Sequence, residues 1–114
     1  MKVAMRRVYD PPEPGEDLRV LVDRVWPRGI SKDKVDLWLK DIAPSTGLRK
    51  WYGHVPERWP SFRQKYLREL SGNPEAVAEL RKAGRRRTVT LLYGAKDRER
   101  NQAVVLTEFL RKKR

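Results

Sequence analysis

The sequence predicts a small α/β domain, a three-layer structure with about four strands in a mostly parallel or mixed sheet and helices packed on it. Apolar segments of strand type and of helix type alternate in the second half of the chain, as they do in α/β folds. Residues 88–93, TVTLLY, are almost entirely apolar or β-branched, which is typical of a central strand covered on both faces. Because the chain has 114 residues, we expect a single domain over residues 1–114.

The first half of the chain predicts strands separated by loops. Residues 2–9 form the first strand, since apolar side chains recur there among basic ones. Residues 11–15 are rich in proline and glycine, which interrupt regular structure, and residues 18–25 form the second strand. Ser31 can cap one short helical turn. Apolar residues alternate over residues 35–40, which favours a third strand, although an amphipathic helix fits so short a pattern as well. Whether the first two strands are neighbours stays open.

The second half predicts helices around the strongest strand. Pro60 and Pro74 suit the first turns of two helices, and Gly84 suits the end of the second. The last helix carries an apolar stripe at helical spacing. The expected helices cover residues 48–52, 60–70, 74–83 and 102–111.

The composition excludes several kinds of site. The chain has no Cys, so disulfides, thiolate catalysis and thiolate metal sites are ruled out. A single His makes a histidine-based metal cluster unexpected, and we expect no metal and no cofactor. No segment approaches the ~20 apolar residues of a membrane span, and the start of the chain lacks the apolar core of a secretion signal. We therefore expect a cytoplasmic protein without membrane contacts, in which a homodimer would help to bury the four Trp residues.

The positive charge is concentrated near the end of the chain. The net charge is +12, and residues 81–114 contain 12 Lys or Arg and 3 Asp or Glu, a net charge of +9. Nucleic acid and anionic or phosphorylated small molecules are the natural partners of such a segment. Two plainer explanations compete: a basic surface kept for solubility, and Arg85, Arg86 and Arg87 placed at the negative end of a helix.

Charged residues follow two of the predicted strands at the point where each strand ends. Asp23, Arg24 and Arg28 follow the second strand, and Lys96 follows the last one, after a glycine that lets a ligand approach the backbone. Ligands of open α/β sheets bind outside the carboxyl ends of the strands. If these two strands are neighbours, Arg24, Arg28 and Lys96 converge on one space of the size of an anion, while Asp23 acts as a catalytic base or orients an arginine.

Other residues can complete this site, each with a structural alternative. Asn101 and Tyr93 can donate hydrogen bonds, and Trp26 can stack on a ring or simply pack in the core. Ser45 and Thr46 can bind a phosphate, but capping of the following helix also explains them. Two further residues carry weaker hypotheses. Asp10 can join Asp23 as a carboxylate pair for Mg²⁺ or serve as a turn former, and His54 is better explained as a surface or structural residue.

Six segments in this order cover nearly the whole chain: VYD at 8–10, VLVDRVWPRGIS at 20–31, WLKDIAPST at 38–46, LRKWYGH at 48–54, FRQKYLREL at 62–70 and TLLYGAKDRERNQAVVL at 90–106. They resemble the YeaO-like branch of a large bacterial and archaeal family known as domain of unknown function 488. The resemblance implies a small α/β domain and brings no established reaction with it. It also implies a site formed by Asp23, Arg24, Pro27, Arg28 and Gly29 facing Lys96, Asp97 and Asn101.

Other branches of the wider family differ in one respect that bears on chemistry. Many of them carry Cys residues in the last strand–loop–helix, followed by a His-Arg pair. Here the first Cys position corresponds to Tyr93, and the later segment reads Asn101-Gln102-Ala103. A thiol or metal role is therefore not expected to carry over to this chain.

Three functions remain for the chain. The first is a binder or small enzyme for an anionic ligand, phosphorylated and possibly a nucleotide, at the carboxyl ends of the strands. The second is a nucleic-acid-binding module that uses the basic last third. The third is an interaction domain that does no chemistry. Whether the protein is an enzyme stays open at this level.

Overall fold

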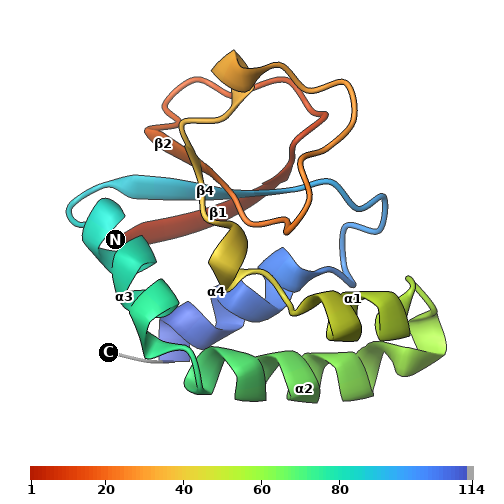
Figure 1. Cartoon of the computed structure of the whole chain (residues 1–114). Coiled ribbons are helices and arrows are strands. Elements are labelled where there is room, and N and C mark those ends of the chain that lie inside the picture. Colours follow the sequence, from red (N-terminus) through yellow and green to blue (C-terminus); the bar gives the residue numbers. More distant parts are fainter. Residues whose placement is uncertain (113–114) are drawn as a thin grey trace.

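The computed structural model describes residues 1–112, and within them all strands belong to one parallel sheet (Figure 1). The strand order is β1-β4-β2-β3, so the last strand of the chain lies between the first two. The strands are β1 (Lys2–Arg7), β2 (Leu18–Leu21), β3 (Leu37–Trp38) and β4 (Thr88–Tyr93). The prediction of a small α/β domain is confirmed, and β1 and β2 are not neighbours.

Four α-helices and three 3₁₀ turns complete the described part of the chain. Proline stands in the first turn of two of the helices, and glycine follows the last residue of three of them. The helices are α1 (Thr46–Tyr52), α2 (Trp59–Ser71), α3 (Pro74–Ala83) and α4 (Gln102–Lys112), and the 3₁₀ turns are η1 (Lys32–Lys34), η2 (Lys40–Ile42) and η3 (Pro56–Arg58). No helix within residues 1–112 is long and apolar enough to cross a membrane.

The two faces of the sheet are covered differently. Figure 1 shows all four helices on one side of the sheet. Val20 and Leu91 point to this side and are fully buried against them, because alternate residues of a strand face opposite ways. On the other side, Leu21 and Leu92 are covered by side chains of the loops, among them Trp26. The third layer of the domain is thus made of loops and the η1 turn rather than of helices.

Strand β4 is the centre of the sheet, as its sequence predicts. Leu91 pairs with Met5 of β1 on one side and with Val20 of β2 on the other. The second strand is shorter than expected, although the Val22 backbone N–H still donates to Leu92 O over 3.1 Å. The third strand has only two residues, since β3 pairs with β2 alone at the edge of the sheet. These pairings bring the carboxyl ends of β2 and β4 side by side.

Polar contacts fix helices α1 and α2 to each other and to the η2 turn. The Ser45 side chain caps α1 by accepting from Leu48 N over 3.2 Å. Ser45 also donates to the Glu69 carboxylate of α2, with its backbone N–H over 2.8 Å and its hydroxyl over 2.6 Å. Tyr66 of α2 is fully buried and donates its hydroxyl to Ile42 O over 2.7 Å. Together these contacts give α1 a defined place beside the ends of the strands.

Candidate functional site

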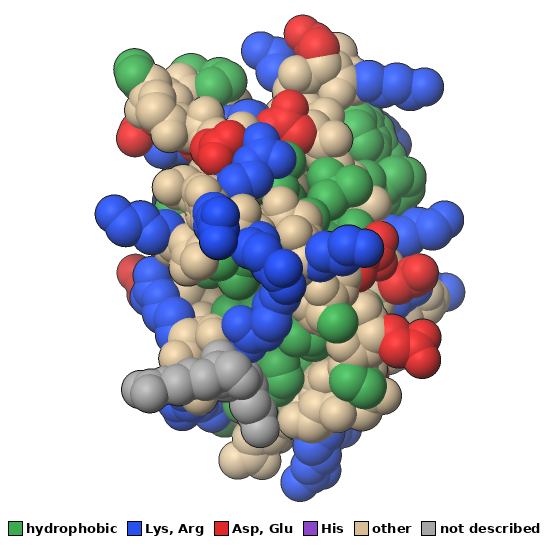
Figure 2. Space-filling model, turned by 90° about the vertical axis from the view of Figure 1, so that its left-hand side faces the viewer, with side chains coloured by type: hydrophobic (Ala, Val, Ile, Leu, Met, Phe, Trp, Pro, Cys, Tyr) green, Lys and Arg blue, Asp and Glu red, His purple; other side chains and the backbone are tan. Residues whose placement is uncertain are grey.

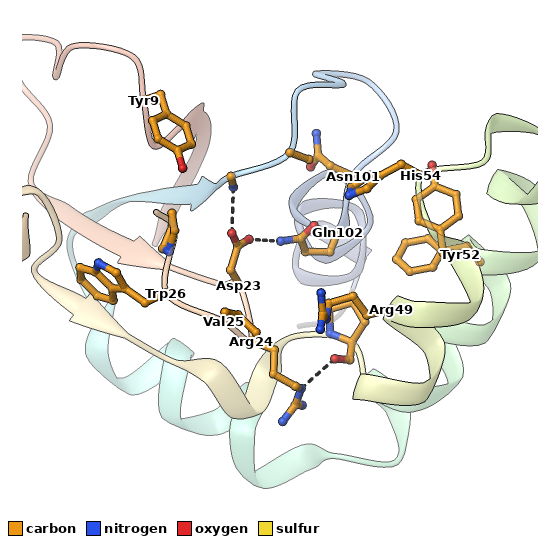
Figure 3. Close-up of a pocket in the computed structure, with 15 residues that line it drawn as sticks. Tyr9, Asp23, Arg24, Val25, Trp26, Arg49, Tyr52, His54, Asn101 and Gln102 are labelled. Carbon is orange, nitrogen blue, oxygen red and sulfur yellow. Dashed lines mark hydrogen bonds between the residues drawn. The ribbon is translucent and has the colours of Figure 1, made fainter. Parts of the chain in front are cut away.

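A pocket of about 290 Å³ opens at the carboxyl ends of β2 and β4 (Figure 3). Its lining combines the segment after β2, the helix α1 with the turn that follows it, and the segment that joins β4 to α4. Asp23 lies near the centre of the view, between the end of β4 and the start of α4. The position is the one that open α/β sheets commonly use for ligands.

The Asp23 carboxylate is held by two donors from the far end of the chain. The Gly94 backbone N–H donates to Oδ2 over 2.9 Å, and the Gln102 side-chain amide donates to Oδ1. Gly94 is required for this contact, because a Cβ at that position would lie only 2.8 Å from Asp23 Oδ2. The carboxyl group therefore has one fixed orientation, with both oxygens already bonded.

Burial governs the protonation of this carboxyl group. It raises the pKa of Asp23 to about 6, against the opposing effects of the Gly94 and Gln102 hydrogen bonds and of the positive charge on Arg49. Near neutral pH the group is mostly ionised but takes up a proton on mild acidification. An acidic residue with a perturbed pKa in a concave site marks a candidate functional site.

Two guanidinium groups bring positive charge to the pocket. Arg24 donates through Nε to Pro44 O over 2.9 Å and through Nη2 to Ala43 O over 3.1 Å, so its side chain is fixed against the segment before α1. Arg49 lies on α1, and its guanidinium has no hydrogen bond or salt bridge with any residue in the described part of the chain. Of the two cations, Arg49 is the one whose donors stay available to a ligand.

Aromatic rings form much of the remaining wall. Tyr52 stacks on Phe62, with ring centroids 4.4 Å apart, and lies 5.8 Å from the ring of His54. His54 has a φ of 58° and follows Gly53 with a φ of 52°, so two successive residues take the left-handed conformation. That conformation is uncommon for a non-glycine residue and often occurs at functional sites. Trp26 completes the wall and donates its Nε1–H to Ile30 O over 2.8 Å.

The start of α4 forms one side of the pocket. Asn101 is buried and caps this helix, since its Oδ1 accepts from Val104 N over 3.2 Å. Its amide nitrogen donates to Asp97 O over 2.9 Å. The Asp97 carboxylate in turn accepts from the backbone N–H groups of Glu99 and Arg100 over 2.9 and 3.0 Å. These contacts order the loop after β4 and leave the Asn101 amide occupied by the fold.

The family model described as the inactive DUF488-N3 subclade matches residues 2–114. The chain belongs to this DUF488-N3i family. Its relatives include the uncharacterised protein YeaO of Escherichia coli K12, which is 43% identical over 114 residues, covering 97% of this chain and 98% of the relative. The uncharacterised protein Rv3073c of Mycobacterium tuberculosis H37Rv is 45% identical over 111 residues, covering 96% and 93%. The YeaO-like resemblance is thus confirmed. No solved structure matches the chain.

In this DUF488-N3i domain, the structure brings together part of the predicted site. Asp23, Arg24, Trp26 and Asn101 all line the pocket. Arg28 and Lys96 are exposed and do not line it, so Arg24, Arg28 and Lys96 do not surround one space as the sequence suggested. The reason is local, because the turn at Arg28 and Gly29 carries the arginine into solvent, and only its backbone oxygen is engaged, by the Tyr9 hydroxyl over 2.8 Å.

Of the remaining predicted residues of the DUF488-N3i site, Pro27 also lines the pocket, and the others lie outside it. Tyr93 faces the helical side of the sheet and is buried in the main core. Asp97 is used by its own loop, as described above. Ser45 is occupied by its helix cap and by Glu69, and Thr46 is exposed on the first turn of α1.

Several pocket residues were not singled out from the sequence, chiefly Arg49, Tyr52 and Gln102. Arg49 stands between buried Leu48 and exposed Lys50 on a short helix, and nothing in that pattern separates it from any surface arginine. Gln102 follows the helix-capping Asn101, and nothing in the sequence indicates that its amide reaches Asp23. The tertiary placement of α1 against the strand ends makes Arg49 and Tyr52 part of the site.

The two carboxylates suggested as a Mg²⁺ pair each have hydrogen-bond donors from the protein. Asp10 is held by Arg98, whose two terminal nitrogens donate to its carboxylate over 2.6 and 3.1 Å. This ion pair lowers the pKa of Asp10, whereas the pKa of Asp23 is raised. Within residues 1–112 there is no cluster of three or more His, Cys, Asp or Glu side chains able to hold a metal ion.

Proposed function

We propose that this domain binds a small anionic molecule that carries a flat ring, such as a nucleoside monophosphate, in the pocket around Asp23, and that it does so without catalysis. The observation that carries the proposal is the combination in one pocket of a fixed carboxyl group, an unengaged guanidinium and an aromatic wall. Each part recognises a different portion of such a ligand.

The positive charge supports an anionic group on the ligand. Arg49 and Arg24 line the same pocket as Asp23, the one carboxylate among its lining residues, so the pocket keeps a net positive charge at neutral pH. A guanidinium binds phosphate or carboxylate through paired donors, and Arg49 has all of its donors available in the described structure. Arg24 adds positive charge to the pocket, while its Nε and Nη2 donate hydrogen bonds to backbone oxygens.

The aromatic wall and Asp23 support a flat, nitrogen-containing ring. Trp26, Tyr52 and His54 offer ring faces or edges on which a planar group can stack. Each oxygen of the Asp23 carboxylate accepts one hydrogen bond from the protein and keeps a lone pair for an N–H donor of the ligand. A nucleobase combines both features, and a pocket of about 290 Å³ suits a ligand of that size.

Binding without catalysis agrees with the family and with the side chains present. The matching family is described as an inactive subclade. The Asp23 carboxylate is fixed by donors from Gly94 and Gln102, and its remaining lone pairs can accept N–H donors of a ligand. A role in holding a ligand uses this geometry as it stands.

Calorimetric titration with adenosine monophosphate, adenosine and inorganic phosphate tests the proposal. We expect the monophosphate to bind at least ~10-fold more tightly than either part alone, and Arg49→Ala to weaken it by ~10-fold or more, which is about 1.4 kcal/mol. Arg28→Ala is the matched control, since Arg28 lies at the same end of the sheet but outside the pocket. Equal weakening by the two substitutions, or no heat at millimolar concentrations of any of the three probes, contradicts the proposal.

A further inference from the structure

A second concave surface lies at the opposite end of the sheet from the pocket. It is a groove of about 550 Å³ at the amino ends of the strands, lined by Met1, Lys2, Val3, Arg81, Leu110 and Arg111. Half of these residues are cationic and none is acidic. The backbone joins the parts of the groove, because Lys2 N donates to Arg87 O over 3.1 Å and Arg111 donates to Val3 O over 3.2 Å.

More cations surround this groove. They lie on the last turn of α3, on the turn that leads to β4 and at the end of α4. Figure 2 looks at this side of the molecule and shows Lys and Arg side chains running across it. We refer to the whole set as the basic face: Lys2, Arg81, Lys82, Arg85, Arg86, Arg87, Arg111 and Lys112.

Most of the charge on the basic face is not neutralised by the protein. Arg87 pairs with Asp17 over 2.8 Å and Lys112 with Glu108 over 3.3 Å. Five members have no carboxylate partner among residues 1–112: Lys2, Lys82, Arg85, Arg86 and Arg111. The face therefore presents an excess of positive charge to solvent.

The end of α3 does not by itself explain the three successive arginines. The last carbonyl groups of this helix are satisfied by the backbone, since Gly84 N donates to Leu80 O over 3.0 Å and Arg85 N donates to Lys82 O over 3.4 Å. The side chains of Arg85 and Arg86 make no hydrogen bond with any described residue and extend into solvent. Arg86 even adopts the left-handed conformation, with a φ of 61°. This turn displays its arginines instead of using them as a cap.

We propose that the basic face binds the phosphate backbone of a nucleic-acid duplex without reading its sequence. Charge complementarity carries the proposal, and the absence of stacking groups specifies the duplex. Proteins that hold single strands combine basic grooves with exposed aromatic rings. The large exposed aromatic residues within the described chain are Tyr9, Trp38 and Trp51, and none of them belongs to the basic face. A surface of Lys and Arg without aromatic rings is suited to the phosphates of a duplex.

The size of the molecule fits this partner. With extents of 35 × 34 × 20 Å, the molecule is about as long as one helical turn of a duplex, which is ~34 Å. If the five unpaired cations each neutralise one phosphate, the logarithm of the affinity falls with the logarithm of the salt concentration with a slope of about −4.5. Between 50 and 200 mM salt the affinity then falls by roughly 500-fold.

Fluorescence anisotropy with a labelled DNA duplex of ~20 base pairs and arbitrary sequence tests the proposal, read at several salt concentrations from 50 to 200 mM. The variant is the double substitution Lys82→Glu with Arg85→Glu. Its control is Lys32→Glu with Lys50→Glu, which changes the net charge equally at exposed residues of η1 and α1. We expect the first pair to weaken binding by ~30-fold or more and to reduce the salt slope by about two. We expect the control to weaken binding by less than ~3-fold.

Three outcomes overturn the proposal: no binding at 50 mM salt, equal weakening by the two double variants, or tighter binding of the unlabelled single strand than of the duplex in competition. The result is separate from the pocket, because Arg49 lies at the other end of the sheet. Arg49→Ala is expected to keep duplex binding within ~2-fold of wild type. Loss of pocket binding and loss of duplex binding can thus be told apart.

Discussion

Replacement of Asp23 by Asn tests the central electrostatic feature of the pocket. An asparagine has the same shape and keeps both hydrogen bonds: its oxygen accepts from Gly94 N–H, and its amide donates to Gln102 once that side chain is turned about its last bond. The substitution removes only the buried negative charge. Its effect on stability must therefore depend on pH.

The sign and size follow from the pKa of Asp23, which burial raises from 3.8 to about 6. Because the folded protein holds this proton more tightly than the unfolded chain, the group contributes full stability below pH ~4 and loses it as the pH rises through ~6. The loss by pH 7 is about 3 kcal/mol relative to the protonated protein, since each pKa unit is worth 1.36 kcal/mol. Between pH 4 and pH 7, wild type should lose about 2.5 kcal/mol relative to Asp23→Asn.

Urea denaturation of the two proteins at pH 4, 5, 6 and 7 measures this difference. The comparison cancels the other titrating groups, such as Asp10 and Glu108, whose lowered pKa values make wild type and variant alike gain stability as the pH rises. As the pH rises through 6, the free energy of unfolding of wild type should fall relative to that of the variant. The variant should be the more stable protein at pH 7. Parallel curves between pH 4 and pH 7 would refute the reasoning and show that Asp23 is fully solvated or fully paired.

Three further substitutions test the structure around the two sites. Gly94→Ala places a Cβ about 2.8 Å from Asp23 Oδ2 and should lower the free energy of unfolding by ~1–3 kcal/mol in chemical denaturation, because the Gly94–Asp23 hydrogen bond breaks. Glu69→Ala removes the acceptor of both Ser45 donors and should lower the free energy of unfolding by ~1–3 kcal/mol. Because α1 is then held less firmly, calorimetry should also show weaker binding of adenosine monophosphate. Arg86→Gly removes the steric strain of a side chain in the left-handed conformation. It should raise the free energy of unfolding by up to ~1 kcal/mol, seen as a slightly higher melting temperature.

Each of these has a control in the same chain. Gly47→Ala adds a Cβ that meets nothing within 4 Å and should be neutral or stabilising. Glu75→Ala removes an exposed carboxylate from the first turn of α3 and should cost well under ~1 kcal/mol. Arg85→Gly, beside Arg86 but without a positive φ, should destabilise the protein. If Gly94→Ala proves as neutral as Gly47→Ala, the close approach of Asp23 to Gly94 is wrong.

The sequence predicts the sheet well where strands are long and buried. Residues 88–93 are apolar or β-branched throughout, and β4 occupies those residues at the centre of the sheet. The strand over residues 35–40 is shorter in the structure, because its length depends on pairing with a single neighbour at the edge. Periodicity describes which side chains are buried but carries no information on how many partners a strand has.

The place of the pocket was predictable from the sequence, but the side chains that line it were predictable only in part. The rule that ligands bind at the carboxyl ends of parallel strands locates the pocket beside Asp23, and the neighbouring position of β2 and β4 supports it. The sequence could not predict the directions of the arginine side chains, because these depend on acceptors that the fold brings close. Arg24 turns to the carbonyl of Pro44, and α1 delivers Arg49 in place of Arg28.

The strand order also dictates when the domain can fold. β1 and β2 are not neighbours, and both pair with β4, which follows them in the chain. Until residues 88–93 are made, the earlier strands have no common partner, so the sheet cannot form step by step along the chain. Closing it requires joining segments that are more than sixty residues apart, which is slow for a domain of this size. We therefore expect fragments that end before β4 to lack the assembled sheet, because neither β1 nor β2 then has its partner strand at the centre.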